Sequence, residues 1–230
     1  MRTIELSPFN RLHGIAIDDQ DRLYVLSEEK GVLLRIDDAA HASAPSGAVA
    51  TGAIKAHMVV TNRSGSRAYV TGLLSGTVSA VDPHDASRPP VVAAVGPLPE
   101  SCALSDDETS LFVGVRGARE IVQLDAATLR QEKRVAVQGD PLRVYVVPGE
   151  ETLLTTDIEN RTVTRYGADL REVQSLQFDA VPAGISFHHS KPIAFVTLLD
   201  SNQVAMVDLE SFTTVRTIST GPEPDVTALI

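Results

Sequence analysis

The chain of 230 residues contains no tryptophan, a single cysteine and few aromatic side chains, which make up 4% of it. With only Cys102 present, an intrachain disulfide is impossible, and its apolar neighbours predict a small buried hydrophobe. Because aromatic residues are scarce, the core must be packed mainly with Val, Ile, Leu and Ala. The length is nevertheless sufficient for a sizeable core.

Positive charge is also scarce, since 20 Lys and Arg stand against 30 Asp and Glu and give a net charge of −10. Such a surface repels phosphate and anionic lipid headgroups, so neither nucleic acid nor a membrane is an expected partner. No run of 18 apolar residues occurs, and the first ten residues lack the apolar segment of a signal peptide. The sequence predicts a soluble protein, cytoplasmic by default and exported if a leader has been removed.

The common sequence motifs of catalysis are absent. The chain has no GxGxxG, GxxxxGK(S/T), HExxH, GxSxG or paired CxxC motif. The acidic turn at 18–21 has the composition of a calcium loop but lacks the downstream bidentate Glu, so a solvated hairpin is expected. We therefore predict no cofactor and no metal site from these motifs.

What the chain does have is an internal repeat of about 43 residues. The apolar segments that open the repeats begin 43, 45, 42 and 41 residues apart, at 14–17, 57–60, 102–105, 144–147 and 185–188. Each is followed by three more short runs rich in Val, Thr, Ile and Tyr, separated by turn residues, which predicts four strands per repeat. Four antiparallel strands in a recurring unit are typical of a β-propeller blade.

The predicted fold is therefore an all-β propeller, a single domain over residues 1–230 with five complete blades. Fragments of a further repeat remain at both ends: Arg2-Thr3-Ile4 matches Arg216-Thr217-Ile218, and 221–230 matches an inter-blade turn and a first strand. We expect the two termini to meet in a reduced sixth blade. If the ring of blades is instead incomplete, a second copy could fill the gap, which would make the protein a homo-oligomer.

Two further features of the repeat carry structural predictions. The third run of four repeats ends in Asp37, Asp82, Asp125 and Asp208, and this recurrence favours a carboxylate that accepts backbone N–H bonds in a turn over a metal ligand. The first strands should be covered on both sides. That predicts burial of Ile15, Ile17, Met58, Val60, Cys102, Leu104, Val144, Val146, Ile185 and Phe187.

The segments AYVTGLLSGTVSAVD at 68–82 and AFVTLLDSNQVAMVDLESFTTVRTISTGPEPD at 194–225 resemble the YVTN-type β-propeller repeat. The resemblance extends over the whole chain and is weakest in the fourth repeat, where Gly167 stands at the Asp position. It implies the propeller fold. The broader propeller group includes lactonases, lyases, electron-transfer subunits and binding proteins, so the resemblance implies no single reaction.

Candidate site residues follow from where a propeller brings its loops together. The turns that enter the first strands meet at one mouth of the central channel, where side chains from all blades converge. Loops between second and third strands reach the same face and add Glu28, Arg116, Asp157, Asn160, Arg161, Asp200 and Asn202. From both sets, the predicted ligand-binding residues are His13, His57, Glu100, Arg143, Asp157 and Asp225.

Two functions of different classes are compatible with this set. The first is a non-catalytic binding or scaffold propeller that uses the channel mouth for a small molecule, peptide or protein. The second is a small lactonase-like hydrolase or lyase, with His13 or His57 as base, Arg143 holding an anionic group, and with or without a metal ion. The same ring of charges could also simply solvate the channel mouth.

Overall fold

The computed structural model describes residues 3–225 of the chain and is built of β-strands in five four-stranded sheets. Every sheet is a meander in which consecutive strands are neighbours. One short 3₁₀ helix, η1, spans Arg116–Ala118. No helix of the described residues has the length and apolarity that crossing a membrane requires. The chain divides into two compact units, one ending at Arg134 and the other beginning at Val135, and each is described by itself.

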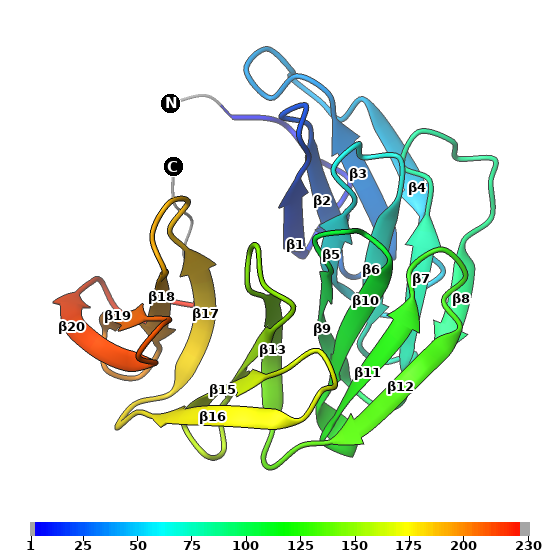
Figure 1. The fold of residues 1–230 in the computed structure, drawn as a ribbon. Coiled ribbons are helices and arrows are strands. Elements are labelled where there is room, and N and C mark those ends of the chain that lie inside the picture. Colours follow the sequence, from blue (N-terminus) through cyan, green and yellow to red (C-terminus); the bar gives the residue numbers. More distant parts are fainter. Residues whose placement is uncertain (1–2, 226–230) are drawn as a thin grey trace. The chain divides into compact units, whose positions relative to one another are not determined.

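The first unit holds three sheets (Figure 1). The first sheet comprises β1 (Leu12–Ile17), β2 (Leu23–Ser27), β3 (Val32–Ile36) and β4 (Gly47–Ala50). The second comprises β5 (Ala56–Thr61), β6 (Ala68–Gly72), β7 (Thr77–Val81) and β8 (Val91–Ala94). The third comprises β9 (Pro99–Leu104), β10 (Ser110–Val115), β11 (Glu120–Asp125) and β12 (Gln131–Ala136). The first strands β1, β5 and β9 contact one another in turn.

Apolar side chains on facing sheets form the core of the first unit. Tyr24 and Leu26 on β2 pack with Val59 and Val70 of the second sheet. Because strand side chains alternate, Tyr69 on β6 points the other way and packs with residues of the third sheet. The middle strands are thus buried on both faces, which explains their nearly continuous apolar sequences.

The second unit holds two sheets built in the same way. The fourth sheet comprises β13 (Pro141–Val146), β14 (Leu153–Asp157), β15 (Thr162–Tyr166) and β16 (Glu172–Gln177). The fifth comprises β17 (Pro182–Phe187), β18 (Ile193–Leu198), β19 (Gln203–Asp208) and β20 (Thr213–Ser219). Leu154 and Val163 pack with Ile185, Val196 and Ala205 in one cluster. These two units confirm the prediction of four short antiparallel strands per repeat and an all-β fold.

The prediction that the first strands are covered on both sides is wrong for β1. Ile15 and Ile17 are 60% and 62% exposed. They pair with Val25 and Leu23 and so lie on the same face of the sheet as those residues. Residues 3–9 place apolar side chains against the β2 and β3 part of this face. The remaining first-strand residues of the prediction are buried or half-buried.

The predicted turn carboxylates are confirmed in three of four repeats. Asp82, Asp125 and Asp208 accept backbone N–H bonds from residues two or three positions later, at 2.9, 2.7 and 2.8 Å. Asp37 differs, because its carboxylate accepts the guanidinium of Arg35 at 2.7 Å. The arginine therefore replaces the backbone as the partner in the first repeat.

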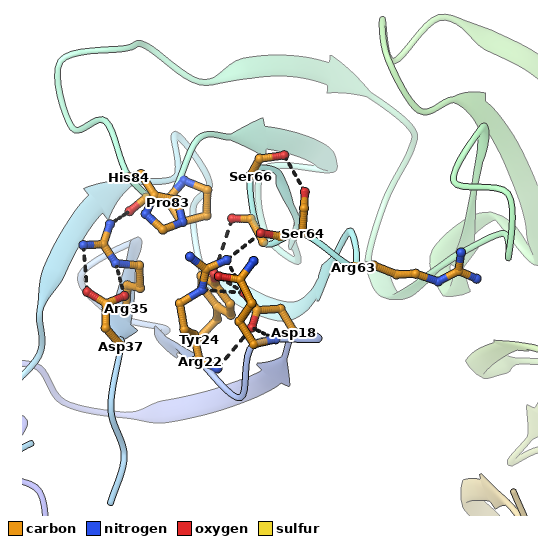
Figure 2. Close-up of polar contacts among 12 residues, drawn as sticks. Asp18, Arg22, Tyr24, Arg35, Asp37, Arg63, Ser64, Ser66, Pro83 and His84 are labelled. Atoms are coloured by element: carbon orange, nitrogen blue, oxygen red, sulfur yellow. Dashed lines mark hydrogen bonds and ion pairs between the residues drawn. The ribbon is translucent and has the colours of Figure 1, made fainter. Parts of the chain in front are cut away.

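The acidic turn at 18–21 is a hairpin with Asp19, Gln20 and Asp21 exposed, as expected, but Asp18 is buried. Figure 2 shows Asp18 within a polar cluster, where its buried carboxylate accepts bonds from Arg22 Nε at 2.7 Å and Tyr24 Oη at 2.8 Å. Burial alone would raise the pKa of Asp18, but these bonds outweigh burial and lower it to about 2. Arg22 and Tyr24 also bond the carbonyls of Ser64 and Gly65 in the neighbouring repeat, so this cluster ties two sheets together.

Candidate functional site

A recurrent backbone turn positions the predicted site residues. Arg11, Lys55, Leu98 and Glu223 each adopt a left-handed conformation, with φ between 51° and 59°. Each stands two residues before a predicted site residue: His13, His57, Glu100 and Asp225 respectively. The carbonyls of Arg11, Lys55 and Leu98 accept a backbone N–H from the residue that follows the second strand of the sheet. The repeat thus places these four residues at one equivalent position, two residues after the left-handed turn residue.

In the first unit, His57 lies between two carboxylates. Its Nδ1 is 3.0 Å from Glu28 Oε1 and its Nε2 is 2.8 Å from Glu100 Oε1. All three residues are less than 10% exposed. When both carboxylates are ionised, each imidazole nitrogen must donate a proton, because a carboxylate can only accept. His57 therefore has no ring nitrogen left to accept a proton from another molecule.

Arginines extend this arrangement at both ends. Arg11 Nε is 2.8 Å from Glu28 Oε2, and Arg116 Nη1 is 3.2 Å from Glu100 Oε2. Burial would raise the pKa of Glu100, but the bonds and charges of His57 and Arg116 outweigh burial and lower it to about 2. The pKa of Glu28 is also lowered, for the same balance between burial and its bonds to His57 and Arg11. The result is a chain of alternating charges across three sheets.

His13 belongs to the same group but is exposed. Its imidazole stacks on that of His57 with centroids 3.9 Å apart, and its Nδ1 is 3.1 Å from the His57 carbonyl oxygen. The close approach of β1 to β5 requires glycine at position 14, because an added Cβ there would lie 2.7 Å from the same oxygen. The glycine that follows His13 is thus explained by packing.

Sequence reasoning anticipated most of this cluster. It placed His13, His57 and Glu100 together, which the contacts bear out, and assigned Glu28 and Arg116 to the same face. It missed Arg11, since the position is basic in only two of the repeats. Its only signal is its place two residues before His13, where Lys55 stands in the next repeat.

In the second unit, Arg143 and Asp225 form a looser pair. Arg143 Nη2 is 3.6 Å from Asp225 Oδ1; the arginine side chain is 6% exposed and the aspartate side chain 53%. The backbone carbonyl of Asp225 accepts a hydrogen bond from Thr197 Oγ1 at 2.9 Å. Arg143 lies one position further along its strand than Glu100 does, because Pro141 of β13 and Pro99 of β9 occupy the equivalent positions. The two residues are therefore not strand equivalents, contrary to the alignment behind the prediction.

Asp157 is buried, and its carboxylate accepts a backbone hydrogen bond. Its Oδ1 accepts the N–H of Asn160 at 2.6 Å. Burial raises its pKa, and the bonds from the backbone only partly offset that effect. Among the described residues, no hydrogen bond or ion pair joins it to Arg143 or Asp225, so the structure brings Arg143 and Asp225 together and leaves Asp157 in its own turn.

The chemistry open to these groups is limited by how they pair. Within residues 3–225, no three His, Cys, Asp or Glu side chains are placed to hold a metal ion together. Glu28 and Glu100 lie on opposite sides of the His57 imidazole, so the three do not converge on a point. The cluster in the first unit can orient and rigidify, while its exposed members His13 and Arg11 can contact another molecule.

Comparisons with known proteins show the fold alone. No family model matches the sequence, and a search of curated proteins found no significant match. Many solved structures do match. Among them, Kuenenia stuttgartiensis hydrazine synthase aligns over 97% of this chain and 91% of that chain, with a TM-score of 0.70 and 14% sequence identity. Together with the five meander sheets, this similarity shows that the chain has a β-propeller-like fold.

Proposed function

We propose that this chain is a non-catalytic binding or scaffold β-propeller, which uses the face carrying the first-strand ends for a small molecule, peptide or protein. The observation that carries the proposal is the hydrogen bonding of the His57 imidazole. Both of its nitrogens are engaged by carboxylates, so it serves as a link between blades. A general base needs a free acceptor atom within reach of the proton that it removes.

The surface beside this link suits contact with a partner. His13 is exposed and held by its stack on His57, and Leu12 next to it is 45% exposed. Arg11 adds an exposed guanidinium anchored on Glu28. An exposed apolar side chain flanked by fixed polar groups is the composition that protein and ligand interfaces use.

A test must separate binding from the alternative, a lactonase-like hydrolase or lyase. We would assay the purified protein, with and without added divalent metal ions, against a panel of lactones and esters, together with His57→Asn, His13→Ala and the control His41→Asn. His41 is exposed, and its imidazole Nδ1 lies 2.8 Å from Asp38 Oδ2. We expect no turnover that depends on His57 or His13. Turnover lost in either variant but kept in His41→Asn would overturn the proposal and establish the hydrolase.

We also propose that the chain is a YVTN-type repeat protein whose ends form a reduced sixth blade. Support comes from the tail, which follows the repeat up to Asp225. Thr197 Oγ1 bonds the Asp225 carbonyl as Thr71 Oγ1 bonds that of Glu100. The exposed Ile15 and Ile17 supply an apolar strand face that a further strand would cover. At the other end, Thr3 and Ile4 form no strand, and Arg2 and residues 226–230 lie outside the described residues.

A further inference from the structure

The guanidinium of Arg143 is buried without acceptors for two of its nitrogens. Arg143 is 5% exposed, and its Nε and Nη1 have no hydrogen-bond partner among the described residues. Burying an unpaired donor costs free energy, and the cost is larger when the group is charged. In native proteins, buried donors almost always have a hydrogen-bond acceptor. The nearby Asp225 fills this role only in part. Its oxygen is 3.6 Å from Nη2, beyond normal hydrogen-bond distance.

A second buried donor stands beside it. Thr156 on β14 pairs with Arg143 across the strands and is fully buried, and its Oγ1 has no partner among the residues described. The equivalent threonine of β18, Thr197, accepts Gly184 N at 2.6 Å and donates to the Asp225 carbonyl at 2.9 Å. The equivalent hydroxyl of β6, on Thr71, is likewise bonded twice. Of the three sheets that carry a threonine at this position, the fourth alone leaves its hydroxyl without a partner among the described residues, and it does so where the arginine stands.

We propose that Arg143 and Thr156 form a binding site for a small oxyanion, a carboxylate or phosphate group, and that Asp225 is the chain's own competitor for it. The proposal rests on the binding function above and assigns its ligand class. Arginine donors recognise planar carboxylates and phosphates, and a threonine hydroxyl can donate to the same oxygen. The half-exposed Asp225 supplies a negative charge without saturating the donors, so an anion with better geometry would displace it.

The experiment follows the Arg143 Nε–H signal by NMR while sodium acetate or sodium phosphate is added, with sodium chloride at equal ionic strength as reference. Loss of the signal in Arg143→Lys assigns it. Acetate and phosphate separate a carboxylate ligand from a phosphate ligand. We expect a saturable shift with one or both anions and none with chloride. In Asp225→Asn the affinity should rise about two- to fivefold, because a half-exposed carboxylate 3.6 Å from the guanidinium competes only weakly.

Glu223→Gln is the matched control, since it removes the same charge from the same exposed tail two residues earlier. Its affinity should equal that of the unchanged chain. Equal responses of Glu223→Gln and Asp225→Asn would overturn the competition by Asp225. A signal that changes only as in chloride, in both the unchanged chain and Asp225→Asn, would overturn the site and leave ordered water as the acceptor. Neither result affects the turnover assay of the His57 and His13 variants, which tests separately whether the chain is a non-catalytic protein.

Discussion

A histidine held between two carboxylates stabilises a fold only while both carboxylates are ionised and accept hydrogen bonds from the imidazole. At His57 the pairing extends from Arg11 to Arg116, so each carboxylate in the row lies between the imidazole and a guanidinium. Burial makes this arrangement sensitive, because removal of one member leaves the next one charged and unpaired in a poor solvent. The consequence can be measured at Glu100.

Replacement of Glu100 by glutamine should destabilise the protein by about 3 kcal/mol near neutral pH, because His57 and Arg116 both lose their carboxylate. Urea unfolding of the variant measures the change. Glu132→Gln is the control, since Glu132 makes only an exposed contact with Arg130, and should change stability by less than about 0.5 kcal/mol. Equal effects of the two substitutions would show that the row of charges contributes nothing specific.

The pH dependence follows from the lowered pKa of Glu100. Its folded value is about 2, against an ordinary value of 4.5, so its contribution is complete above pH 4.5 and is lost as the pH falls toward 2. We expect the unfolding free energy to fall over this window, and to fall less steeply in Glu100→Gln. Chemical unfolding at a series of pH values measures both slopes, and identical slopes would contradict the pKa assignment.

Cys102 offers a test of burial at a single atom. Its thiol is buried in β9, and burial raises its pKa to about 12. The thiolate is the reactive form of cysteine. A disulfide reagent at pH 8 should therefore modify the folded protein only at the rate at which local or global unfolding exposes Cys102. It should modify the urea-unfolded protein at once. Rapid modification of the folded chain would contradict the packing of β9 between its neighbours.

What the sequence predicts at this scale depends on whether a role repeats. The turn carboxylates recur in four repeats and were recognised correctly in three. Asp18 occurs once, and its partners Arg22 and Tyr24 come from the following strand, so composition alone suggested a solvated turn. Arg11 was missed for the same reason. A unique polar contact is visible only after the strands have been aligned in space.

Strands are the elements that sequence periodicity describes best, because burial on both faces leaves a long apolar run between turn residues. Middle strands of the first three sheets follow this rule, whereas β15, with the sequence TVTRY, does not. Ile15 and Ile17 break it, because their apolar pattern belongs to the repeat while their exposure depends on what covers the first sheet. Periodicity identifies a strand and cannot identify its neighbour.

At the level of one strand, Ile185 tests the packing of the second unit. It is buried in β17 against the fourth sheet, so Ile185→Ala should cost on the order of 2–4 kcal/mol. Val215→Ala on β20 is the control, because Val215 is 53% exposed and its truncation should change little. Thermal unfolding of both variants provides the measurement. If Ile185→Ala melted at the same temperature as the control, the burial of Ile185 against the fourth sheet would be contradicted.

For the molecule as a whole, the tail decides whether the ends form a sixth blade. Two truncations separate local bonds from closure. Removal of residues 222–230 eliminates the bonds of Glu223 to Asn202 and of Asp225 to Thr197, which alone should cost roughly 1–3 kcal/mol. Removal of 226–230 spares both bonds and deletes only Val-Thr-Ala-Leu-Ile, the apolar stretch proposed to complete the blade. If the stretch completes a blade, the shorter deletion also lowers the melting temperature, because the apolar surface of one strand becomes exposed to water.

The oligomeric state provides a second measurement of closure. Light scattering after size exclusion should show a monomer for the full chain. An unchanged melting temperature after the shorter deletion would contradict closure by the tail, and an obligate dimer would indicate that a second copy takes its place.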